Sequence, residues 1–123
     1  MKKLLHLFLV LILSSMQIAH AQSSSSKVES ERTVLTSGLQ KFYPNPIIQG
    51  SDMTIEYNMD ISGEILIFIL DALGNIKFQQ RENLKSGYNE FLLGINMLEK
   101  GVYMMKIKDA TSNDVTVKKI IIK

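Results

Sequence analysis

The sequence contains no cysteine and no tryptophan, and it has no long block of acidic or basic residues. Without cysteine there are no disulfides, thiolate metal sites, cysteine nucleophiles or lipidated N-terminal cysteine of a bacterial lipoprotein. Without a charged block, the composition is neither that of a disordered polyelectrolyte nor that of a nucleic-acid-binding protein. A chain of this length must therefore be held together by the packing of its core.

The composition is that of one small, soluble, globular domain. The chain has 123 residues, 46% of them hydrophobic and 21% charged. Its formal net charge of +2 comes from 14 Lys and Arg against 12 Asp and Glu. This length and balance favour a single domain with no nucleic-acid partner.

The first residues have the pattern of a secretory signal peptide, which we expect at residues 1–21. Lys2 and Lys3 give it a positive start, and an apolar run follows at residues 4–13. Ala19 and Ala21 then form the small-x-small pattern that a signal peptidase reads. The apolar run is shorter than the roughly 20 residues that cross a bilayer, so we expect cleavage after Ala21 and no transmembrane anchor in the mature chain.

Histidine occurs only at His6 and His20, and this cleavage removes both. Without His or Cys, the mature chain can form neither a Ser-His-Asp or Cys-His nucleophile system nor a zinc site of the common ligand types. A pair of carboxylates acting as acid and base would need a cleft, which about 80 ordered residues seldom enclose. We therefore expect no enzyme, no cofactor and no small-molecule substrate.

The rest of the chain divides into a spacer and a β domain. Residues 22–38 are rich in serine and charge and predict a flexible spacer. Residues 39–123 have the periodicity of strands, with alternation at 53–59 and a β-branched and aromatic run at 64–70. No segment beyond the signal peptide has a helical pattern.

Turn residues separate the predicted strands. Turns at 71–75, 85–87 and 99–101 and a polar loop at 109–114 divide the domain into about six or seven short strands. Such spacing predicts an all-β, antiparallel β-sandwich. The predicted core comprises Ile65, Ile67, Ile69, Phe78, Phe91, Leu93, Tyr103, Met105 and Ile107.

Five elements follow one another through this domain: FYPNP at 42–46, LDALG at 70–74, SGYN at 86–89, KGVY at 100–103 and KKIIIK at 118–123. Behind a signal peptide, this succession resembles the type A C-terminal sorting domain of type IX secretion substrates from Bacteroidetes. The resemblance implies an immunoglobulin-like antiparallel β-sandwich of about six to eight strands. It also implies a sorting module that directs a Sec-exported protein through the periplasm to an outer-membrane type IX translocon. A sortase-like peptidase often removes the domain, which leaves the cargo at the cell surface or outside the cell.

The resemblance carries over a set of sorting-motif positions: Pro44, Asn45, Pro46, Asp71, Gly74, Gly101, Tyr103, Lys119 and Lys123. The fold alone accounts for several of them. Gly74 and Gly101 are expected in turns, and the side chain of Asp71 is expected to begin a turn. Tyr103 is expected in the core, with its hydroxyl at the rim. The packing of a core does not account for the lysines at the end of the chain, Lys118, Lys119 and Lys123. They are the better candidates for recognition.

Other readings stay open. Family members usually carry a large cargo before the sorting domain, whereas here only residues 22–38 precede it, so a stand-alone secreted or surface β-sandwich with an adhesion or binding role is the alternative. An exposed aromatic platform would favour that role. The loop residues Asp109, Ser112, Asn113 and Asp114 offer oxygen ligands for calcium, but a solvated loop of this composition is commoner, and no metal is expected.

Overall fold

The computed structural model describes residues 35–123, so the signal peptide expected at 1–21, its cleavage residues Ala19 and Ala21, and residues 22–34 of the expected spacer lie outside the described residues. Within this part the chain forms strands and no helix, and hence no helix that is long and apolar enough to cross a membrane. The strands are β1 (Gly38–Tyr43), β2 (Met53–Met59), β3 (Gly63–Leu70), β4 (Ile76–Leu84), β5 (Gly87–Leu93), β6 (Gly101–Asp109) and β7 (Val115–Ile122).

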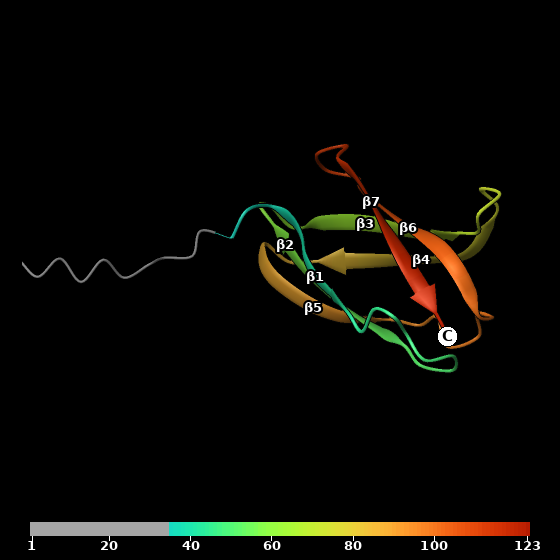
Figure 1. Cartoon of the computed structure of the whole chain (residues 1–123). Helices are drawn as coiled ribbons and strands as arrows, with labels where there is room; N and C mark the ends of the chain where they lie inside the picture. Colours follow the sequence, from blue (N-terminus) through green and yellow to red (C-terminus); the bar gives the residue numbers. More distant parts are fainter. Residues whose placement is uncertain (1–34) are drawn as a thin grey trace, which may run out of the picture. The chain divides into compact units, whose positions relative to one another are not determined.

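The seven strands form two antiparallel sheets that pack face to face (Figure 1). One sheet has the order β1-β2-β5 and the other the order β4-β3-β6-β7. The predicted antiparallel, immunoglobulin-like all-β sandwich is therefore confirmed. The chain passes directly from β4 in the four-stranded sheet to β5 in the three-stranded sheet, so residues 85–86 close one end of the sandwich.

Strand β3 lies inside the four-stranded sheet, as its apolar sequence indicated. It forms a hairpin with β4, in which Ile69 faces Phe78, and it pairs on its other side with β6, in which Ile67 faces Ile107. Its even and odd residues alternate between the two faces of the sheet. Ile65, Ile67 and Ile69 consequently point into the sandwich and are fully buried.

The core contains most of the predicted residues, but Phe78 and Phe91 are only partly buried. Their strands, β4 and β5, are edge strands with a neighbour on one side only, so no further strand covers the outer flank of either ring. The structure adds core residues from β2, the end of β4, β7 and the loops, which the predicted core did not include: Ile47, Met53, Ile55, Tyr57, Met59, Leu84, Ile95, Ile120 and Ile122.

Candidate functional site

The FYPNP element after β1 lies against the terminal KKIIIK element. The side-chain amide of Asn45 donates from Nδ2 to the carbonyl oxygen of Lys119 at 3.1 Å, and its Oδ1 accepts from the backbone N–H of Ile121 at 3.0 Å. One donor and one acceptor are what a neighbouring strand would offer from its peptide group. The Asn45 side chain therefore takes the place of a strand beside β7.

Main-chain pairing continues this contact toward the end of the chain. The N–H of Ile47 donates to the carbonyl of Ile121 at 2.7 Å, and the N–H of Lys123 donates to the carbonyl of Ile47 at 2.8 Å. The N–H of Gln49 then donates to the carbonyl of Lys123 at 2.9 Å. Ile47 forms a parallel bridge with Ile122 and is buried in the core, so the 45–49 segment is a short covering strand for the last part of β7.

Pro44 and Pro46 flank Asn45 on the exposed surface. Proline has no N–H to donate and is confined to the edges of sheets. The two prolines therefore leave Asn45 to complete the hydrogen bonding of β7 with its side chain. The motif positions Pro44, Asn45, Pro46, Lys119 and Lys123 belong to one contiguous surface, which the sequence analysis had not placed together.

Asp71 organises the hairpin turn between β3 and β4. Its Oδ1 accepts from the backbone N–H groups of Leu73 and Asn75, both at 2.9 Å, and its carbonyl accepts from the N–H of Gly74 at 3.0 Å. The hydrogen bond from the Asn75 backbone is the largest of the effects that lower the pKa of Asp71. Gly74 has a φ of 84°, which only glycine adopts without strain.

Tyr103 and Gly101 lie at the start of β6. The ring of Tyr103 is buried, and its hydroxyl donates to the carbonyl of Glu99 at 2.7 Å. A Cβ on Gly101 would approach the Tyr103 ring at 3.5 Å, which is ordinary contact. Asp71, Gly74 and Tyr103 thus have contacts within the fold that account for them without a partner molecule.

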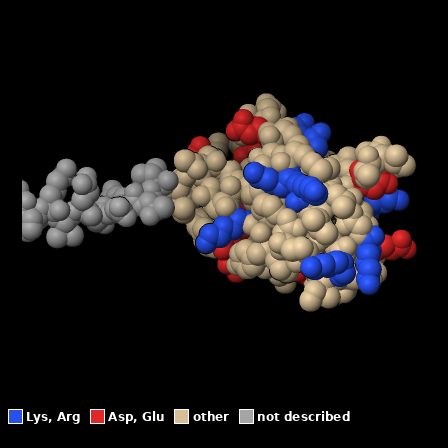
Figure 2. Space-filling view, in the orientation of Figure 1, with Lys and Arg blue, Asp and Glu red and all other residues tan. Residues whose placement is uncertain are grey.

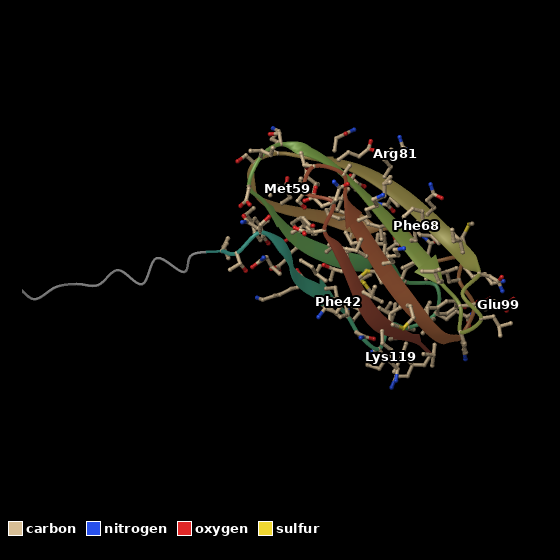
Figure 3. The ribbon with its side chains drawn as sticks, turned by 90° about the horizontal axis from the view of Figure 1, so that it is seen from above. Phe42, Met59, Phe68, Arg81, Glu99 and Lys119 are labelled. Carbon is tan, nitrogen blue, oxygen red and sulfur yellow. The ribbon has the colours of Figure 1, made fainter. Side chains whose placement is uncertain are left out.

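The lysines at the end of the chain differ from these residues. Lys118, Lys119 and Lys123 are exposed, and in the described part of the chain no carboxylate lies within ion-pair distance of their ammonium groups. Figure 2 shows Lys and Arg side chains spread over otherwise uncharged surface on the side of the molecule where Figure 1 draws β7. Figure 3 places Lys119 on β7, at the surface. Lys119 stands on the part of β7 whose backbone is held by β6 on one side and by the 45–49 segment on the other.

The loop between β6 and β7 is stabilised by Asp109. This residue is buried, and its Oδ1 accepts from the N–H and the hydroxyl of Thr111, at 2.8 and 2.7 Å, and from the N–H of Ser112 at 3.3 Å. Burial acts to raise the pKa of Asp109, but the hydrogen bonds from Thr111 and Ser112 outweigh it and lower the pKa. Among residues 35–123 no group of three or more acidic or histidine side chains gathers as a metal site.

Asp109→Asn is expected to destabilise the protein by about 1–3 kcal/mol at pH 7, because amide and hydroxyl donors lose a buried carboxylate acceptor. A carboxyl whose folded-state pKa is lowered stabilises the fold above its unfolded pKa, and this contribution is lost as the pH falls through the folded pKa. The difference in the free energy of unfolding between variant and parent should therefore become smaller below about pH 4. Urea unfolding at pH 7 and pH 3 measures it. Asp114→Asn, in the same loop, is the control and should change stability by less than about 0.5 kcal/mol.

The chain matches a known protein family. The family described as the secretion system C-terminal sorting domain matches residues 41–123. The match begins inside β1 and includes every sorting-motif position named above, from Pro44 to Lys123. No curated protein matches the chain.

The chain was also compared with solved structures. PorZ, described as an essential bacterial surface component of the type IX secretion system of Porphyromonas gingivalis, aligns with a TM-score of 0.50 and 20% sequence identity over 70% of this chain. The chain spans only 11% of the PorZ chain, so the likeness concerns the fold of one part of it. Two structures of a β-glucosidase from Listeria innocua, one of them with glucose, align at TM-scores of 0.41 and 0.40 with 18% and 19% identity, over 70% of this chain and 16% of theirs.

Proposed function

The chain belongs to the family of type IX secretion system C-terminal sorting domains, and from this premise we propose that its β-sandwich is a non-enzymatic address that directs a Sec-exported protein across the outer membrane. Membership implies a role in type IX sorting and export to the cell surface. The observation that carries the proposal is that the family match extends from within β1 past the end of β7 and so includes nearly the whole sandwich. The family is one of sorting domains and not of catalytic domains.

The proposed partners are the outer-membrane type IX translocon and a sortase-like peptidase, which the protein would meet after transit through the periplasm. The surface proposed for recognition is formed by Pro44, Asn45 and Pro46 together with Lys119 and Lys123. Its support is geometric, because Asn45 hydrogen-bonds to Lys119 and Ile121 and thereby fixes the strand that displays the lysines. Asp71, Gly74, Gly101 and Tyr103 are proposed to maintain the fold that presents this surface.

The alternative, a stand-alone adhesion or binding module, gains support from one observation. Tyr43 and Tyr88 are both exposed on the three-stranded sheet, and the hydroxyl of Tyr88 donates to Glu90 at 3.1 Å. Local desolvation, followed by the hydrogen bond to Glu90 and nearby carboxylates, raises the pKa of Tyr88 to about 12. Exposed rings beside carboxylates are an aromatic surface of the kind that would favour this alternative.

An export assay tests the proposal. A signal peptide, an inert reporter and residues 35–123 are joined and expressed in a host with type IX machinery, and the reporter is measured in the periplasm and the medium. We expect the reporter outside the cell for the intact domain. Changing Lys118, Lys119 and Lys123 together to Gln should retain it in the periplasm, because the change removes the charges and leaves the apolar residues of β7 in place.

The matched control changes Lys85, Lys100 and Lys106 to Gln, which removes the same charge elsewhere on the sandwich at exposed lysines that form no ion pair in the described part of the chain. This control should be exported like the parent. Normal export of the tail variant would exclude recognition of the basic tail. If the intact domain is not exported in a strain that exports a known substrate, the sorting proposal is wrong, and the binding module takes its place.

A further inference from the structure

The sandwich has two lateral sides, each formed by one edge strand from each sheet, and the backbone groups of these edge strands are covered to different extents. On the side of β4 and β5, the side chain of Gln80 donates from Nε2 to the carbonyl of Leu92 at 2.9 Å, and its Oε1 accepts from the N–H of Gly94 at 3.1 Å. Gln80 thus covers the edge of β5 as Asn45 covers the end of β7. On the side of β1 and β7, the 45–49 segment covers only residues 119–123. The first half of β7 has no such cover in the described part of the chain.

The direction of the backbone groups in this half follows from the pairing. Lys119, Ile121 and Lys123 direct peptide groups away from β6, since these groups bond to the 45–49 segment. Peptide groups alternate in direction along a strand, so Val115 and Val117 also direct theirs away from β6. No hydrogen bond from another described residue meets these groups, and an uncovered row of this kind is a template for a further strand.

A groove runs beside this free edge. It has a volume of about 370 Å³ and lies between β1, which supplies residues 39–43, and β7, which supplies Lys118. Figure 3 shows β1, with Phe42, beside β7, with Lys119, on one side of the sandwich. The two strands belong to different sheets and are both edge strands, so an added strand at β7 would also lie against the side chains of β1.

The charged residues that line the groove are positive. Lys41 and Lys118 line it, Lys119 follows on β7, and none of the lining residues is acidic. Acidic residues lie on the neighbouring strands, where Glu56 faces Lys41 across the β1–β2 pair and Glu56 and Glu90 both lie near the Tyr43 side chain. The lining also offers apolar contact from Leu39 and Phe42.

We infer that the free edge of β7 at residues 115–118, together with the N–H of Lys119, binds an extended segment of a partner protein as an added strand, and that acidic side chains of this segment contact Lys118 and Lys119. Main-chain hydrogen bonds supply the affinity in this mode of recognition, and side chains supply the selectivity. The inference deepens the proposed function, because it states the chemistry of the partner: an extended segment with acidic side chains. It rests on the proposed function only where it assigns this segment to the translocon.

The test uses the mature chain in solution and two synthetic peptides of eight residues, one alternating Glu with Val and one alternating Lys with Val. Amide hydrogen exchange is followed residue by residue. We expect the acidic peptide, at millimolar concentration, to slow exchange of the Val117 and Lys119 amides at least tenfold. The basic peptide should leave them unchanged. Equal effects of the two peptides, or none from either, would overturn the inference.

Two variants isolate the backbone contribution. Val117→Pro removes an N–H that makes no hydrogen bond to β6, and edge strands tolerate proline at such positions, so the fold should persist while binding of the acidic peptide is lost. Val117→Thr keeps the N–H and the β-branched shape and should bind like the parent. Unfolding curves for both variants establish that the fold is intact. Undiminished binding by a folded Val117→Pro variant would contradict strand addition.

The result is independent of the export assay. Peptide binding without export would leave the edge as a binding site and refute its role in sorting, whereas export without peptide binding would refute only the inference. If a second copy of the chain occupies the edge, the Val117 amide will be protected without peptide, and its protection will rise with protein concentration. That outcome would replace the acidic partner with self-association.

Discussion

Ile67→Ala is expected to lower the free energy of unfolding by about 2–5 kcal/mol. Ile67 is fully buried and lies on β3, with Gln80 of β4 on one side and Ile107 of β6 on the other. Strands on both sides limit how far the backbone can move to fill the space left by the removed methyl and methylene groups. Since a domain of this kind is stable by only about 5–15 kcal/mol in total, the variant should lose a large part of its stability.

Urea unfolding followed by circular dichroism measures this change. Ile48→Ala is the matched control, because it makes the same substitution at a residue whose side chain is 70% exposed, and it should change stability by less than about 0.5 kcal/mol. Similar losses in the two variants would contradict the placement of β3 inside the sandwich. Because Ile67 is remote from the tail, an unstable variant should also fail in the export assay without any change to the recognition surface.

The sequence predicted those parts of the fold that depend on local pattern. The alternation at residues 53–59 and the apolar run at 64–70 became β2 and β3, and Asp71 and Gly74 formed the predicted hairpin turn. Each of these features is determined by residues close together in the chain. The alternation also identifies the buried face of a strand, which is why Tyr103, Met105 and Ile107 of β6 were predicted correctly as core.

What alternation does not determine is the neighbour of a strand. The period of β4 and β5 places Phe78 and Phe91 on the inner face, but it does not show that both strands lie at edges, where the rings are only partly covered. The same limit applies to Gln80, whose contacts with Leu92 and Gly94 bridge the two sheets. A polar residue on the inner face of a predicted strand was the available signal for it.

The sequence predicted which residues belong to the site, but it did not predict which of them are in contact. Asn45 reaches Lys119 and Ile121, which are 74 and 76 positions away in the chain, and no local pattern specifies such a contact. The signal available was an asparagine between two prolines, where the backbone has no N–H to donate at either flank. The resemblance to a family connected the two ends of the motif, and the structure supplies a physical reason for that connection.

Removal of residues 119–123 is expected to abolish the fold. The deletion takes away the buried side chains of Ile120 and Ile122, each worth about 1.5–3 kcal/mol of burial, and it leaves Ile47 without its hydrogen-bonding partners. Asn45 loses both of its contacts with β7. The combined loss is comparable to the whole stability of a small domain, on the order of 5–15 kcal/mol. Circular dichroism should show loss of the strand spectrum, and proteolysis should become rapid.

The Gln variant of Lys118, Lys119 and Lys123 should keep the spectrum and the unfolding midpoint of the parent, because all three side chains are exposed and form no ion pair in the described part of the chain. The two changes therefore separate the two roles of the tail. Lost export in the truncated chain alone would mean that the tail serves the fold, whereas lost export in the folded Gln variant would mean that its charges are recognised. A truncated chain that still unfolds cooperatively would contradict the covering role of the 45–49 segment. The sandwich would then be stable although that segment had lost the end of β7 with which it pairs.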